Sequence, residues 1–146
     1  MFRPVVVSFL IASYLCSTGC GSISAAGSAE KKFNIILETP PNAARVASPL
    51  LLKGRVDGSI HRGYLVVIVH PLATPLYFVQ RSPSRPNADG VFQTLCYLGT
   101  KSGAGLNEEF EIVVLLSKRP LDEGTTFRSL PSSLASSDII TVTRVR

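Results

Sequence analysis

The chain has 146 residues, enough for one domain, and 45% of them are apolar while 17% are charged. These values exclude a disordered chain and leave no room for a second core. The net charge of +5 comes from 15 basic and 10 acidic residues scattered along the sequence, so no basic stripe indicates nucleic-acid binding. Ten prolines and 11 glycines in short clusters indicate many turns and favour an all-β fold.

The first 20 residues have the pattern of an export signal. Met1-Phe2-Arg3 supplies a positive start, and residues 4–15 are apolar except for Ser8 and Ser13. A membrane-spanning helix needs about 20 apolar residues, so this run is too short to cross a bilayer. We therefore expect a signal peptide over residues 1–20.

The end of this segment, Thr18-Gly19-Cys20, resembles a bacterial lipobox, in which a Cys receives diacylglycerol and becomes the new amino terminus. The resemblance implies lipidation at Cys20 and stable attachment to a membrane. Ser17 stands where a lipobox usually has Leu. The alternative is cleavage by an ordinary signal peptidase after Ala26 or Ala29, which would discard Cys20 and give a secreted protein.

The rest of the chain predicts a spacer followed by a β domain. Residues 21–32 are rich in Ser, Ala and Gly and are typical of a flexible linker, and the domain is expected over residues 33–146. Period-two patterns and short apolar runs, bounded by turn residues, predict seven strands, over residues 33–37, 50–56, 63–71, 76–79, 91–98, 110–116 and 139–145.

The run Tyr64 to Val69 is apolar throughout, which predicts a central strand buried on both faces. Lys53 and Arg55 are expected on a solvent-facing side of their strand. Residues 118–137 show no sustained period, although residues 130–134 predict a single helical turn. In the last strand, Ile140 and Val142 are expected to face the core, with Thr141, Thr143 and Arg144 on the polar side.

The spacing of several strand and turn motifs resembles that of immunoglobulin-like or fibronectin-III-like modules of exported bacterial proteins. The motifs are Pro40-Pro41-Asn42, Leu52-Lys53-Gly54, Asp89-Gly90-Val91-Phe92, Gly99, Phe110-Glu111-Ile112 and Val142-Thr143-Arg144. The resemblance covers residue 33 to the end, and the chain has no Trp for the Cys and Trp core of true immunoglobulin domains. The resemblance implies a single seven-stranded antiparallel β-sandwich that serves as a binding or spacer module. It assigns no functional residue to this chain, because such modules share a fold without sharing a site.

Candidate catalytic and metal-binding residues are few. A nucleophile hypothesis pairs Cys96 with His61 or His70, but Cys96 lies mid-strand on the expected core face. The two His lack convergent ligands, and Asn87 and Asp89 fit turn positions better than a calcium site. Cys96 is also the only Cys outside the signal region, so no disulfide is expected. We therefore expect no catalytic residue, cofactor or metal.

Two kinds of binding are compatible with this sequence. The first is a lipid-anchored envelope protein that binds another protein through its loops or a strand edge. The second is a carbohydrate-binding module, which would use aromatic rings for stacking with help from Arg81 and Arg85. The candidate aromatic residues are Tyr64, Tyr77, Phe78 and Tyr97. The expected partners are thus a membrane through the lipid anchor and either an envelope protein or a cell-surface glycan.

Overall fold

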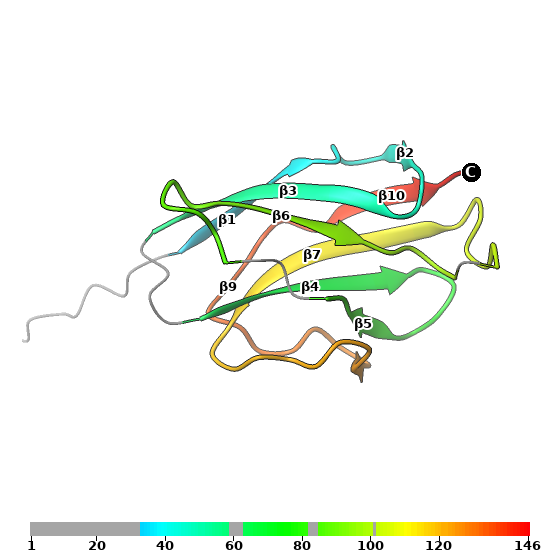
Figure 1. Ribbon diagram of the computed structural model, residues 1–146. Coiled ribbons are helices and arrows are strands. Elements are labelled where there is room, and N and C mark those ends of the chain that lie inside the picture. Colours follow the sequence, from blue (N-terminus) through cyan, green and yellow to red (C-terminus); the bar gives the residue numbers. More distant parts are fainter. Residues whose placement is uncertain (1–32, 59–62, 82–84, 101) are drawn as a thin grey trace, which may run out of the picture.

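The computed structural model describes residues 33–58, 63–81, 85–100 and 102–146 (Figure 1). Within these ranges the chain forms strands and turns without a helix, so the predicted all-β class is confirmed. The predicted signal peptide, Cys20, the spacer and His61 lie outside the described residues. The strands are β1 (Asn34–Thr39), β2 (Ala44–Val46), β3 (Leu50–Asp57), β4 (Tyr64–Pro71), β5 (Tyr77–Val79), β6 (Val91–Cys96), β7 (Glu109–Ser117), β8 (Thr126–Phe127), β9 (Ala135–Ser136) and β10 (Ile140–Arg144).

The strands form two sheets that pack face to face, an arrangement compatible with a β-sandwich. The first sheet has the order β1-β3-β6, and the second has the order β2-β10-β7-β4-β5-β8, with β9 also paired to β7. Figure 1 shows β3 and β6 in one layer and β7 and β4 in the other. The longest ladder joins β4 to β7 and runs from Tyr64 opposite Ser117 to Pro71 opposite Phe110.

All seven predicted strands are present, and the structure adds β2, β8 and β9. These three strands have two or three residues each, and neither an apolar run nor a period-two pattern marks them in the sequence. The sheet is also not purely antiparallel as predicted, because β2 pairs with β10 in the parallel direction. The β2–β10 pairing depends on a contact between distant parts of the chain.

The main core lies between the two sheets and is formed by every second residue along their strands. Leu52 on β3 and Phe92 on β6 are buried against Val67 on β4 and Ile112 on β7. Burial of one such side chain contributes about 1.5–3 kcal/mol. The two sheets supply apolar side chains all along their inner faces. Apolar packing stabilises this core, and Cys96 lies within it as a free thiol.

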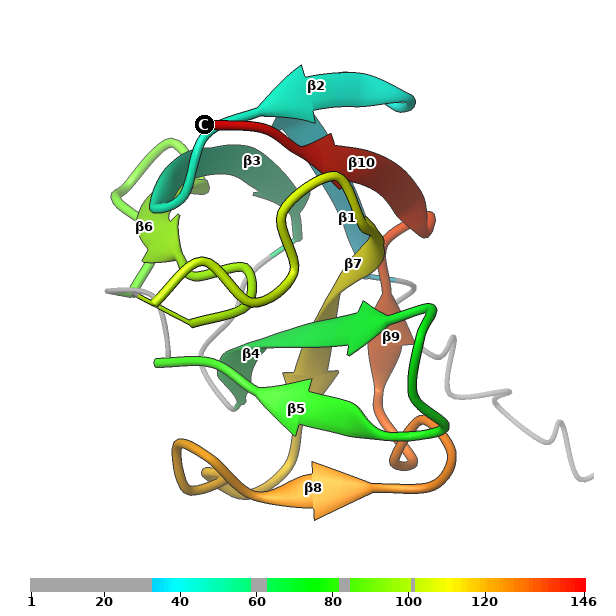
Figure 2. The same ribbon diagram turned by 90° about the vertical axis from the view of Figure 1, so that its right-hand side faces the viewer.

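A second apolar layer covers the outer face of the larger sheet. Val66, Ile68, Val113 and Leu115 point away from the main core, yet each is at most 3% exposed. Partly buried residues of the segment that follows β7 pack against them, namely Leu121, Phe127 and Leu130. Figure 2 shows β8, which belongs to this segment, on the far side of β5 from the smaller sheet. The prediction that the central strand is buried on both faces is therefore confirmed.

Two local predictions were wrong. Residues 130–134 form no helical turn; they run as extended chain beside β7, with the Leu134 amide donating a hydrogen bond to the Leu116 carbonyl. Arg144 does not lie on the polar side of β10, because it shares the inward parity of Ile140 and Val142 and is only 9% exposed. Its charge is accommodated by main-chain carbonyl groups that the strand pattern does not reveal.

Candidate binding surfaces

The structure does not bring Cys96 and His70 together. Cys96 lies in the main core with no exposed surface, whereas His70 follows Ile68 by two residues and so shares the outer face of the larger sheet. Burial raises the pKa of the Cys96 thiol to about 12, because desolvation penalises the thiolate. Cys96 is therefore buried and protonated, and it packs as a core residue.

The loop before β6 uses its side chains for turn formation. Oδ1 of Asn87 accepts hydrogen bonds from the amides of Asp89 at 3.0 Å and Val91 at 2.8 Å. Asp57, on the neighbouring strand, pairs with Arg55 at 3.3 Å. In the part of the chain that the structure describes, no group of three or more His, Cys, Asp and Glu residues is placed to hold a metal ion.

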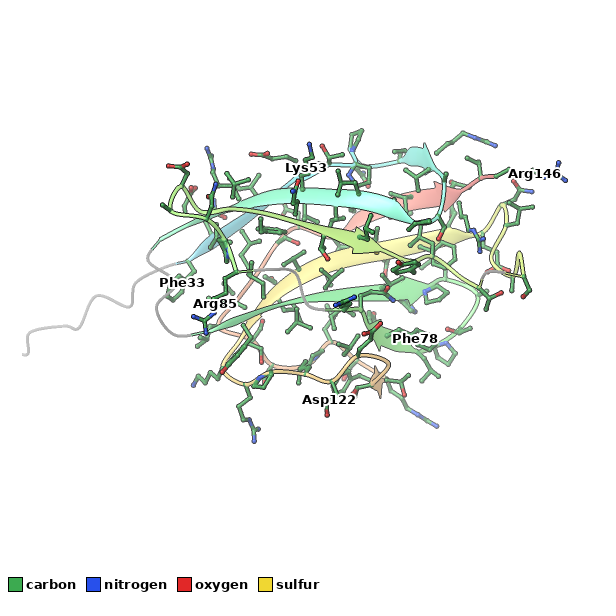
Figure 3. The ribbon with its side chains drawn as sticks, viewed as in Figure 1. Phe33, Lys53, Phe78, Arg85, Asp122 and Arg146 are labelled. Carbon is green, nitrogen blue, oxygen red and sulfur yellow. The ribbon has the colours of Figure 1, made fainter. Side chains whose placement is uncertain are left out.

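The four aromatic residues proposed for carbohydrate stacking do not form one platform. Tyr77 and Phe78 are neighbours on β5 and therefore point to opposite faces of the sheet. Tyr64 pairs with Ser117 at the other end of β4, and Tyr97 follows β6 in the smaller sheet. Figure 3 shows Phe78 on β5 and Arg85 near the opposite end of the molecule.

Tyr77 is part of a row of polar side chains on the outer face of the larger sheet, which we call the polar row. It consists of Tyr77 on β5, His70 on β4, Glu111 on β7 and Thr141 on β10. The register places His70 opposite Glu111, and Glu111 opposite Thr141. Nδ1 of His70 lies 2.9 Å from Oε2 of Glu111, and the rings of His70 and Tyr77 stack with their centroids 4.2 Å apart. Sequence reasoning missed the partnership with Glu111, because 41 residues separate it from His70.

The outer face of the smaller sheet carries exposed apolar side chains. Leu51 on β3 lies opposite Leu95 on β6, and Val91 lies on the same face, each between 39% and 48% exposed. We call these three residues the outer patch. Lys53 and Arg55 lie on the same face of β3 as Leu51, as predicted, and Figure 3 shows Lys53 on the side of β3 away from the larger sheet. The Lys53–Gln93 pair separates Leu51 and Leu95 from Val91, which lies opposite Arg55, so this face mixes exposed apolar side chains with two cations.

A shallow groove of about 570 Å³ lies beside the end of β7. Residues 117–121 and 131–134 line the groove, including the cations Lys118 and Arg119, while Phe127 contributes apolar surface. Among the residues that the structure describes, no acidic side chain lines the groove.

The Arg144 guanidinium organises the loop between β6 and β7. Its Nη1 donates to the Ala104 carbonyl at 2.5 Å, and its Nη2 donates to the Thr100 carbonyl at 3.1 Å. The Arg144 carbonyl in turn accepts from the Asn107 amide at 2.8 Å. These contacts hold the loop against the end of β10, so Arg144 acts as a structural clamp.

Comparison with protein-family models and with curated proteins finds no match for this chain. None of the described residues belongs to a helix long and apolar enough to span a membrane.

Proposed function

We propose that this protein is an exported, lipid-anchored module of the bacterial cell envelope that binds another protein and has no catalytic role. The export pattern of residues 1–20 and the lipobox-like Cys20 support the location. The two-layered β structure supports assignment of residues 33–146 to an immunoglobulin-like domain, a class used widely for binding.

The outer patch is the observation that carries the binding proposal. The chain covers the apolar part of the outer face of its larger sheet with its own residues 121–130, but it leaves Leu51, Val91 and Leu95 of the smaller sheet exposed. A sheet face on which exposed apolar side chains alternate with Lys53 and Arg55 suits a protein partner that offers both apolar side chains and carboxylates.

Site-specific photo-crosslinking in the natural host tests this proposal. A crosslinking amino acid is placed at Leu51 or Leu95, and at Ile139 as the control, because Ile139 is equally exposed at 47% but does not belong to the outer patch. We expect one discrete protein adduct from positions 51 and 95 and none from 139. No adduct from positions 51 and 95, or the same adducts from all three, would refute the outer patch as a binding site.

The intact mass of the protein from the host membrane fraction tests the anchor separately. We expect a chain that begins at Cys20 and carries diacylglycerol. A chain that begins after Ala26 or Ala29 without lipid would refute the anchor and establish secretion.

Carbohydrate binding is the second candidate, and the polar row favours it because an aromatic ring lies beside hydrogen-bonding groups there. Retention on cell-wall or capsule polysaccharide is expected to fall in the Tyr77→Ala variant and to persist in Tyr64→Ala, which removes an exposed ring elsewhere on the same sheet. Equal retention of both variants and the unsubstituted protein would remove this candidate.

A further inference from the structure

His70 uses both nitrogen atoms of its ring. Nδ1 lies 2.9 Å from Oε2 of Glu111, and Nε2 lies 2.9 Å from the carbonyl oxygen of Thr74. An ionised carboxylate and a carbonyl oxygen are both acceptors, so each contact needs an N–H on the ring. A neutral imidazole has one N–H and can make one of these bonds, whereas the imidazolium has two and makes both.

The Thr74 contact ties the loop between β4 and β5 to the sheet. Near its start, the Leu72 amide donates to the Glu109 carbonyl at 3.0 Å, and the Thr74 amide donates to the Pro71 carbonyl at 3.0 Å. Further along, Leu76 has a weaker contact of 3.4 Å from its amide to Oγ1 of Thr74. The bond from His70 to Thr74 is thus the side-chain bond that joins the middle of this loop to β4.

The charged and titratable groups around His70 come from the strands on either side. Glu111 and Glu109 of β7 share the outer face with His70, and Tyr77 of β5 stacks on its ring. The loop itself, residues 72–76, contains no titratable side chain. The nearest charge is the Glu111 carboxylate, which has the sign opposite to that of the imidazolium.

We propose that His70 is a proton-controlled latch for the loop between β4 and β5. When the imidazolium loses a proton, the remaining N–H stays on Nδ1, because a bond to a charged carboxylate is stronger than one to a neutral carbonyl. Nε2 then presents a lone pair to the Thr74 oxygen, and two acceptors at this distance repel each other. The loop, which carries the exposed Leu72, is held at low pH and released as the pH rises. This latch does not depend on the proposed function.

Two measurements on the same protein test the latch between pH 5 and pH 8. The ¹⁵N resonances of the His70 ring report which nitrogen atoms carry a proton, and hydrogen exchange at Leu72, Thr74 and Leu76, corrected for the intrinsic pH dependence, reports loop opening. We expect both nitrogen atoms to be protonated at low pH and only Nδ1 at high pH. Loop exchange should become about tenfold faster at high pH, the effect of one hydrogen bond worth about 1.4 kcal/mol.

A matched pair of variants assigns the effect to its residue. His70→Gln cannot gain a charge, so its loop exchange should be fast at both pH values, whereas His61→Gln, which removes the other histidine of the chain, should keep the pH dependence. A His70 ring that stays neutral over the whole range would overturn the proposal, as would loop exchange that is equal at both pH values. The ring resonances of the unsubstituted protein decide the matter even if His70→Gln fails to fold.

Discussion

Nη1 of Arg144 lies 2.5 Å from the carbonyl oxygen of Ala104, which stands 40 residues earlier in the chain. Together with the Thr100 carbonyl, this contact satisfies two of the donor groups of a guanidinium that is almost completely buried. Its Nε atom is buried without a partner among the described residues. Arg144 therefore stabilises the fold only as long as the loop between β6 and β7 keeps its carbonyl groups in place.

Replacing Arg144 by Met should lower the free energy of unfolding by about 2 kcal/mol, because the Ala104 and Thr100 carbonyls lose their donors. Urea unfolding at equilibrium measures this change. Arg146→Met is the matched control, since Arg146 is exposed, and it should change stability by less than about 0.5 kcal/mol. Equal stability of the two variants would show that Arg144 is no clamp.

Replacing Ile68 by Ala should lower stability by about 2–4 kcal/mol even though Ile68 faces away from the main core, because residues 121–130 cover it. The control is Leu51→Ala on the uncovered face of the smaller sheet, where a loss of less than about 1 kcal/mol is expected. Thermal or urea unfolding measures both variants. A small loss at Ile68 would mean that the covering segment does not exclude water from the sheet.

Replacing Gly54 by Ala should destabilise the smaller sheet by about 1–3 kcal/mol. A Cβ atom at this position would come within 2.5 Å of both the Ile36 carbonyl oxygen and the Phe92 ring, so the backbone of β1 and the core must move. Lys53→Ala, the neighbouring change on the exposed side, is the control. If Gly54→Ala unfolds at the same urea concentration as Lys53→Ala, then β1, β3 and β6 pack less closely than the structure shows.

Cys96 should resist alkylation by iodoacetamide at pH 8 in the folded protein and react in urea, because the folded protein buries the thiol and raises its pKa from 9.0 to about 12. Mass spectrometry of the peptide that contains Cys96 separates it from Cys16 and Cys20. Alkylation of that peptide without denaturant would contradict the burial.

The same pKa shift predicts a loss of stability at high pH. Above pH 9 the unfolded chain releases the Cys96 proton while the folded chain keeps it, so the free energy of unfolding falls between about pH 9 and 12. Cys96→Ala should reduce this slope, which is measured by urea unfolding at several pH values. An unchanged slope would show that Cys96 is not the group responsible.

The sequence by itself determined the fold class, the seven predicted strands and, except at Arg144, the inward face of the strands with an alternating pattern. The alternation along β3 and β6 is a local pattern that indicates one face shielded from water. The unbroken apolar run of β4 is a local pattern that indicates two shielded faces. The double burial of β4 could thus be predicted without knowing what covers it.

Only the tertiary structure decided what lies opposite each face. The segment that covers the larger sheet has no period of its own, because it packs with a few isolated side chains, Leu121, Phe127 and Leu130. Arg144 and His70 have partners on strands and loops some 40 residues away, and a period-two pattern carries no information about such partners. When only the sequence is known, a charged residue in a strand is expected on the exposed face. It lies on the inward face where folding brings carbonyl groups to its donor atoms, and the position of those groups depends on packing rather than on local sequence.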